Sequence, residues 1–157
     1  MIALRLPSVS FGAVSAIVTS IGVIAGFGAA GIPKSTIVGS LLIVGLADNL
    51  TDSLSIHIYQ ESEDLEKRAA FRATVGNFVT RLIISMSFVT PVVALSEMTS
   101  VLVSLGWGIV LLTGLTWLVA KRRGVAVSSE VAKHLVVAAV VIAVSRGIGL
   151  GINAYIS

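Results

Sequence analysis

One stretch of the sequence carries most of the side chains that could bind a cation. The stretch Gly45–Glu61 continues the apolar run Thr36–Val44, and its polar side chains are Asp48, Asn49, Thr51, Asp52, Ser53, Ser55, His57 and Glu61. Asp48, Asp52 and Ser55 follow one another at steps of four and three residues, so a helix would place them on one face. Asn49 lies beside that face. Carboxylate, amide and hydroxyl oxygens suit divalent ions such as Mn²⁺ or Fe²⁺.

Two residues near the end of the stretch extend this candidate metal site. His57 could add a nitrogen ligand near the cytoplasmic mouth, and Glu61 opens an acidic run that could gather a cation. Each also has a plainer interpretation. A lone histidine at a helix end is commonly interfacial, and the acidic run could be a solvated face that Lys67 and Arg68 partly neutralise.

The composition indicates an integral membrane protein. The chain has 157 residues, of which 55% are hydrophobic and 12% charged, against about 25% charged in soluble domains. It contains no cysteine, which excludes disulfides and thiolate metal sites. No serine–histidine–acid arrangement, phosphate loop or zinc spacing occurs, so we expect neither an enzyme nor a resident cofactor. The net charge of +3, with its basic residues at helix ends, does not indicate nucleic acid binding.

Five apolar segments must position these residues. Each is near the roughly 20 residues that cross a bilayer. The sequence therefore predicts an all-α, five-helix transmembrane bundle in one domain, residues 1–157, surrounded by the lipid bilayer. The predicted helices are residues 9–30, 36–59, 73–95, 99–120 and 131–155.

The basic residues predict the orientation of the bundle. Eight of them fall at one end of the predicted helices, and Lys34 alone falls at the other. The eight are Arg5, Lys67, Arg68, Arg72, Lys121, Arg122, Arg123 and Lys133. Because Lys and Arg concentrate on the cytoplasmic side, we expect a cell-membrane protein with a cytoplasmic N-terminus and an external C-terminus.

The first segment carries a stripe of small residues at steps of three and four. The stripe consists of Gly12, Ser15, Thr19, Gly22, Gly26 and Ala30. Such stripes let another helix approach closely in lipid. The stripe therefore predicts either packing within the chain, or a homodimer seam or pathway wall.

Four charged residues lie deep inside the predicted spans, away from their ends: Asp48, Asp52, Arg81 and Arg146. At a rise of 1.5 Å per residue, Asp52 and Arg81 lie at similar depth, and Asp48 and Arg146 both lie near the midplane. We therefore predict the buried pairs Asp52–Arg81 and Asp48–Arg146. Two satisfied pairs would explain every buried charge without transport. Buried arginines that contact both aspartates would favour a non-transporting protein, and an open polar cavity that reaches Asp52 would favour a carrier.

Three stretches resemble the vacuolar iron transporter family. They are Phe11-Gly-Ala-Val-Ser-Ala-Ile-Val-Thr19, Ala25-Gly-Phe-Gly-Ala29 and Gly45-Leu-Ala-Asp-Asn-Leu-Thr-Asp-Ser-Leu-Ser55. The first helix of that family reads roughly G-A-V-D-G-x-V-T, and its second reads roughly G-L-A-N-L-x-A-D-G-x-S-M-A. The resemblance covers about residues 9–63. Beyond it, only the five-helix layout and the proline in the third helix agree.

The resemblance implies a five-helix homodimer that exchanges Fe²⁺ or Mn²⁺ for protons. By position, the second-helix aspartate of the family is Asp52 and the serine that follows is Ser55. The first-helix aspartate falls on Ser15, and the second-helix methionine falls on Ile56, so a charge and a thioether are absent. Asp48 could restore the charge from the second helix.

The sequence thus predicts a homodimeric transporter of Fe²⁺ or Mn²⁺, with proton exchange at Asp52 and Asp48. The alternative is a membrane scaffold or partner subunit that keeps the fold and has lost transport, with Arg81 and Arg146 as the buried partners of the aspartates. A third interpretation is a carrier for another small solute along the same path.

Overall fold

The chain folds into five long helices. The computed structural model describes residues 6–62 and 67–155, except for the side chains of residues 6–11, 56, 60–62, 67, 69 and 70. The described ranges contain no strand. The helices are α1 (Leu6–Ala29), α2 (Lys34–Ser62), α3 (Lys67–Ala94), α4 (Glu97–Arg123) and α5 (Val127–Tyr155).

All five helices are long and apolar enough to cross a membrane. The predicted all-α architecture with five spans is therefore confirmed, and the chain is a multi-pass membrane protein by the length and composition of its helices. Most helices extend beyond the predicted apolar segments. The largest difference is at α3, which begins at Lys67 instead of residue 73, because the polar residues before the span continue the same helix.

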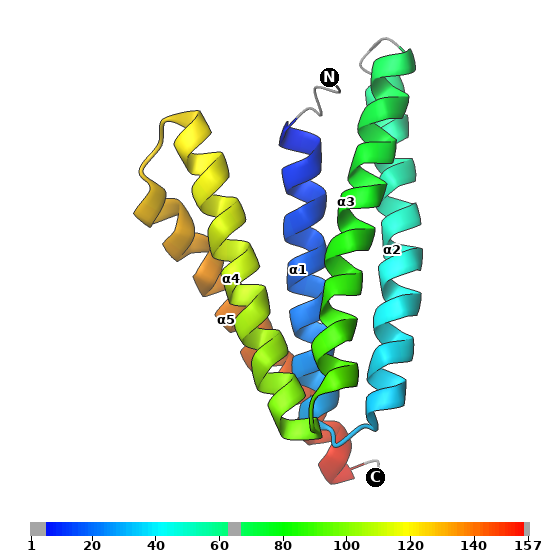
Figure 1. Cartoon of the computed structure of the whole chain (residues 1–157), viewed down its shortest axis with the longest axis vertical. Coiled ribbons are helices and arrows are strands. Elements are labelled where there is room, and N and C mark those ends of the chain that lie inside the picture. The colour runs from blue at the N-terminus through cyan, green and yellow to red at the C-terminus, as the bar shows by residue number, and fades with distance from the viewer. Residues whose placement is uncertain (1–5, 63–66, 156–157) are drawn as a thin grey trace.

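The α1 helix lies at the centre of the bundle and contacts the other four helices. Figure 1 shows α2 and α3 on one side of it and α4 and α5 on the other, with the two described ends of the chain at opposite ends of the bundle. The core consists of apolar side chains from all five helices: Ile17, Ile21, Ile24, Ile37, Leu41, Phe88, Val92, Leu112 and Ala138. The candidate functional site lies among α1, α2 and α3.

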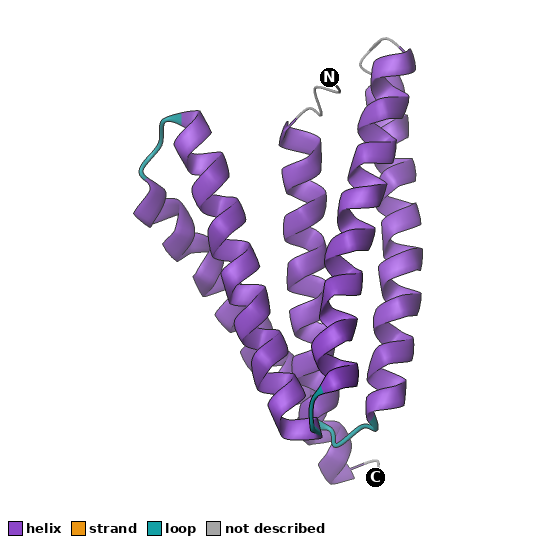
Figure 2. Ribbon diagram, viewed as in Figure 1, coloured by secondary structure: helices purple, strands orange, loops and turns teal. Residues whose placement is uncertain are grey.

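Short loops join α1 to α2, α3 to α4 and α4 to α5 (Figure 2). Gly31 follows α1 with a φ of 69°, and Gly124 ends α4 with a φ of 66°; both are left-handed conformations that glycine adopts without strain. The Lys34 ammonium, at the start of α2, donates a hydrogen bond to the carbonyl of Leu95 just after α3. A cation at a helix C-terminus is stabilising there, so this contact fixes α2 against the end of α3.

The stripe of small residues on α1 packs within the chain. A Cβ added to Gly149 of α5 would lie 2.1 Å from the Gly26 carbonyl oxygen, and one added to Gly22 would lie 3.2 Å from Val141. Gly12, at the other end of the stripe, faces Asn77 of α3. The stripe therefore lets α5 and α3 approach α1 closely, as the intramolecular interpretation predicted.

The outer surfaces of the bundle are apolar. On α2 the exposed large apolar side chains include Leu42, Ile43, Leu46, Leu50, Leu54 and Ile58. On α5 they include Val136, Val137, Val140, Val144, Ile148 and Leu150. Exposed apolar side chains of this kind suit contact with lipid, where the backbone polar groups are satisfied inside each helix.

Candidate functional site

One arginine holds both aspartates of α2. The Arg81 Nη2 atom donates to Asp48 Oδ2 at 2.6 Å, and Nη1 donates to Asp52 Oδ2. Because Asp48 and Asp52 are one helical turn apart, the planar guanidinium of α3 bridges them from a single position. The predicted pair Asp52–Arg81 is confirmed. We call these three residues the Asp48–Arg81–Asp52 cluster.

The predicted pair Asp48–Arg146 is wrong. Arg146 is exposed on α5 and forms no ion pair with a described residue. The α5 helix packs against α1 and α4, on the far side of the bundle from α2 (Figure 1). Similar depth in the membrane therefore did not bring the two residues together, and Asp48 contacts Arg81 instead. Arg146 is not a buried charge partner.

The cluster carries more negative than positive charge. Two carboxylates share one guanidinium, so its formal charge is −1. The Arg81 side chain is 2% exposed, whereas those of Asp48 and Asp52 are 40% and 27% exposed. Arg81 contacts one oxygen, Oδ2, of each carboxylate, and neither Oδ1 atom accepts a hydrogen bond from a described residue. Each carboxylate therefore keeps an oxygen that can bind a second cation.

Two polar residues of α2 beside the aspartates face α3. Asn49 is 1% exposed and donates from Nδ2 to the Phe78 carbonyl at 2.8 Å, and Ser53 is 6% exposed. Asn49 thus joins α2 to α3, and its Oδ1 atom has no hydrogen-bond partner in the described part of the chain. The main role of the Asn49 side chain is therefore to hold α2 against α3.

Ser55 lies on the outer side of α2. Its side chain is exposed, and its hydroxyl donates to the Thr51 carbonyl of the same helix at 2.9 Å. Thr51 in turn donates to the Ala47 carbonyl. Arg81 therefore joins Asp48 and Asp52, whereas the Ser55 hydroxyl is bonded within its own helix.

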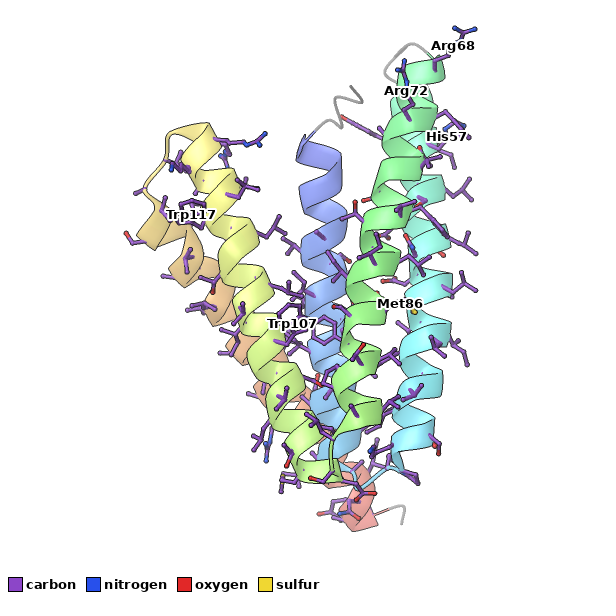
Figure 3. The ribbon with its side chains drawn as sticks, viewed as in Figure 1. His57, Arg68, Arg72, Met86, Trp107 and Trp117 are labelled. Atoms are coloured by element: carbon purple, nitrogen blue, oxygen red, sulfur yellow. The ribbon has the colours of Figure 1, made fainter. Side chains whose placement is uncertain are left out.

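Three predicted site residues remain: His57, Ser15 and Glu61. His57 is half-buried near the end of α2, at the end of the bundle that carries Arg68 and Arg72 of α3 (Figure 3). Ser15 is half-buried on α1. The side chain of Glu61 lies outside the described residues. Within the described part of the chain, no group of three or more His, Cys, Asp or Glu residues could hold a metal ion.

A small pocket with both apolar and polar lining residues adjoins Asp48 between α1, α2 and α3. Its polar lining consists of Thr19, Ser20, Asp48, Arg81 and Ser85, and its volume is about 10 Å³. Sequence reasoning did not assign Ser20 or Ser85 to a site. Ser85 follows Arg81 by four residues, so the helical period places both on one face of α3, and this spacing is the signal that could have found it.

The same face of α3 also carries Asn77, four residues before Arg81. Asn77 is fully buried, and neither its Oδ1 nor its Nδ2 atom has a hydrogen-bond partner among the described residues. A Cβ at Gly12 would lie 1.9 Å from Asn77 Oδ1, so a larger residue on α1 at this point would require the Asn77 side chain to move. Asn77, Arg81 and Ser85 thus form a polar stripe on an apolar helix, which the sequence analysis missed.

No protein-family model matches the chain, and neither the curated proteins nor the solved structures give a match. The resemblance of residues 9–63 to the vacuolar iron transporter family stays a prediction from the sequence.

Proposed function

We propose that the chain is a membrane transporter of divalent metal ions, Fe²⁺ or Mn²⁺, that pass by Asp48 and Asp52. The observation that carries this proposal is the charge of the Asp48–Arg81–Asp52 cluster. One carboxylate would balance Arg81, and the structure has two. A charge in the hydrocarbon region is costly, so the second carboxylate needs a further positive charge. An ion pair with only a structural role would need a single carboxylate, because one carboxylate balances the charge of Arg81.

The charge of the cluster also supports exchange of the metal ion for protons. Its formal charge is −1 without a metal ion and becomes +1 with a divalent ion. A proton or another monovalent cation brings it to zero. The net charge of the cluster thus stays between −1 and +1 in all three states. The carboxylates can therefore bind a metal ion and protons in turn without a large electrostatic cost.

The exposed parts of the carboxylates support access of an ion to the cluster. Asp48 and Asp52 are 40% and 27% exposed in the single chain, although Arg81 is buried. Their Oδ1 atoms accept no hydrogen bond from a described residue. Carboxylate oxygens are suitable ligands for Fe²⁺ and Mn²⁺. The assembly we propose is a homodimer in the cell membrane, with the N-terminal end in the cytoplasm.

A scaffold or partner subunit without transport is the second candidate. The observation that favours it is that Arg81 contacts both aspartates, which is the arrangement expected of a non-transporting protein. The small pocket reaches Asp48 and does not include Asp52 in its lining. In this case the cluster would serve only to hold α2 against α3.

Flux of Mn²⁺ and Fe²⁺ into proteoliposomes distinguishes the two candidates. We expect uptake by the wild type and uptake at the level of empty liposomes for Asp48→Asn and Asp52→Asn. Ser55→Ala is the matched control, because the Ser55 hydroxyl belongs to the same helix and is bonded to the Thr51 carbonyl instead of to the cluster. Absence of flux in a folded wild-type protein would reject the transporter and leave the scaffold.

A further inference from the structure

Two neighbouring side chains of α3 have hydrogen-bonding atoms that the structure leaves unused. Arg81 is 2% exposed, and its Nε–H group has no hydrogen-bond partner among the described residues, although both of its terminal nitrogens bind aspartates. Asn77 is 0% exposed, and both polar atoms of its amide are also without a partner in the described part of the chain. Buried donors and acceptors without a partner are destabilising. A second arrangement that pairs the two side chains would therefore be favourable.

Asn77 and Arg81 lie against the same point of α1. A Cβ at Gly12 would lie 1.9 Å from Asn77 Oδ1 and 3.0 Å from Arg81 Cγ, so the amide oxygen and the stem of the arginine are neighbours. Asn77 precedes Arg81 by four residues, which also places the two side chains on one face of α3. Helical side chains lean toward the N-terminus of their helix, and for Arg81 this is the direction of Asn77. The amide oxygen is therefore an acceptor within reach of the guanidinium.

A divalent ion at the aspartates would compete with Arg81 for the carboxylates. The guanidinium occupies one oxygen, Oδ2, of each carboxylate. Positive charges a few ångströms apart repel more strongly in a protein interior than in water. An acceptor that draws the guanidinium away from the carboxylates would lower this repulsion and free both Oδ2 atoms for the ion.

We propose that Asn77 is a positioning residue that receives the Arg81 guanidinium when a divalent ion binds Asp48 and Asp52. Without the ion, Arg81 bridges the two aspartates, as the structure shows. When the ion binds, the guanidinium turns away from the carboxylates and donates to Asn77 Oδ1. Arg81 is then a tethered cation that the metal ion displaces from the site. This inference rests on the proposed metal site at the two aspartates.

The test is the infrared difference spectrum between Mn²⁺-bound and Mn²⁺-free protein. The full-length protein is purified into lipid nanodiscs with a ¹³C label at the side-chain carbonyl of asparagine. The chain has three asparagines, and the band that disappears in Asn77→Asp belongs to residue 77. We expect Mn²⁺ to shift this band to lower frequency in the wild type, because a hydrogen bond from a guanidinium weakens the carbonyl bond. A purely structural role of Asn77 would leave the band unshifted.

Substitution of Asn77 tests the same inference through the affinity for Mn²⁺. Asn77→Leu keeps the volume of the side chain and removes the acceptor, so we expect Mn²⁺ binding to weaken by about tenfold. Asn77→Asp keeps an acceptor oxygen and should bind Mn²⁺ at least as tightly as the wild type. Thr116→Val is the control and should leave the affinity unchanged. It removes the hydroxyl of a buried residue of α4 that has no hydrogen-bond partner among the described residues.

Failure of this inference is distinguishable from failure of the metal site. An unshifted Asn77 band in the Mn²⁺-bound wild type would overturn the inference and leave the metal site in place. Equal Mn²⁺ affinity of the wild type and a folded Asn77→Leu protein would do the same. Absence of Mn²⁺ binding by the folded wild type would instead reject the metal site itself, and this inference with it.

Discussion

At the scale of single residues, Arg81 is the residue that holds the two aspartates of the site together. It is buried, and its two terminal nitrogens bind Asp48 and Asp52. Removal of one partner from a buried ion pair usually destabilises a protein strongly, because the other charge is left without compensation. Here, one arginine compensates two carboxylates, so its loss should be more damaging than the loss of either aspartate.

We predict that Arg81→Met lowers the free energy of unfolding by about 3–5 kcal/mol. The methionine keeps much of the apolar volume and leaves two carboxylates without a partner. Asp48→Asn should change the stability by less than about 1 kcal/mol, because Asp52 still balances Arg81 and the amide oxygen of the introduced side chain can accept the same hydrogen bond. Unfolding in mixed micelles measures both values. An Arg81→Met protein as stable as the wild type would contradict the ion cluster.

The residues of the cluster were partly predictable from the sequence. Asp52 and Arg81 could be paired because helix length fixes their depth, and depth limits which charges can meet in a membrane. The same reasoning failed for Arg146, because depth does not determine which helices are neighbours. Ser20 and Ser85 were missed because a single serine in an apolar helix has no distinctive pattern, and only the fold shows that both line the pocket beside Asp48.

At the scale of elements, close helix contacts at glycine shape the bundle around the site. The Gly149 contact with the Gly26 carbonyl brings α5 against α1, and the Gly12 contact with Asn77 brings α1 against α3. The sequence predicted the stripe of small residues on α1 but left its partner open. The spacing of small residues shows that one face of a helix allows close packing. Which helix packs on that face depends on the tertiary arrangement of the whole bundle.

We predict that Gly149→Ala lowers the free energy of unfolding by about 1–3 kcal/mol. The added Cβ would lie 2.1 Å from a backbone oxygen, so the two helices must separate to accommodate it. Gly147→Ala is the control on the same helix, because nothing lies within 4 Å of its Cβ. That variant should keep or slightly raise the stability, since alanine favours helix over glycine. Thermal unfolding in detergent compares the two, and equal stability would argue against the close α1–α5 contact.

At the scale of the whole molecule, the apolar composition was enough to predict the architecture. Five segments of sufficient length became five helices, because a lipid environment requires each span to satisfy its own backbone hydrogen bonds. Figure 3 shows Arg68, Arg72 and Trp117 at one end of the bundle, where basic and aromatic residues are expected to meet the interface. The sequence could not predict the arrangement around Arg81, because that depends on which faces of α1, α2 and α3 meet.

Mn²⁺ binding tests most directly whether the surplus carboxylate of the cluster binds a cation. Free Mn²⁺ gives an electron paramagnetic resonance signal that decreases when the ion binds to protein. We predict saturable binding to the purified wild type, loss of that binding in Asp48→Asn and Asp52→Asn, and no change in Ser55→Ala. Absence of Mn²⁺ binding by the folded wild type, or equal binding by Asp48→Asn, would contradict the claim and leave the cluster a purely structural contact between α2 and α3.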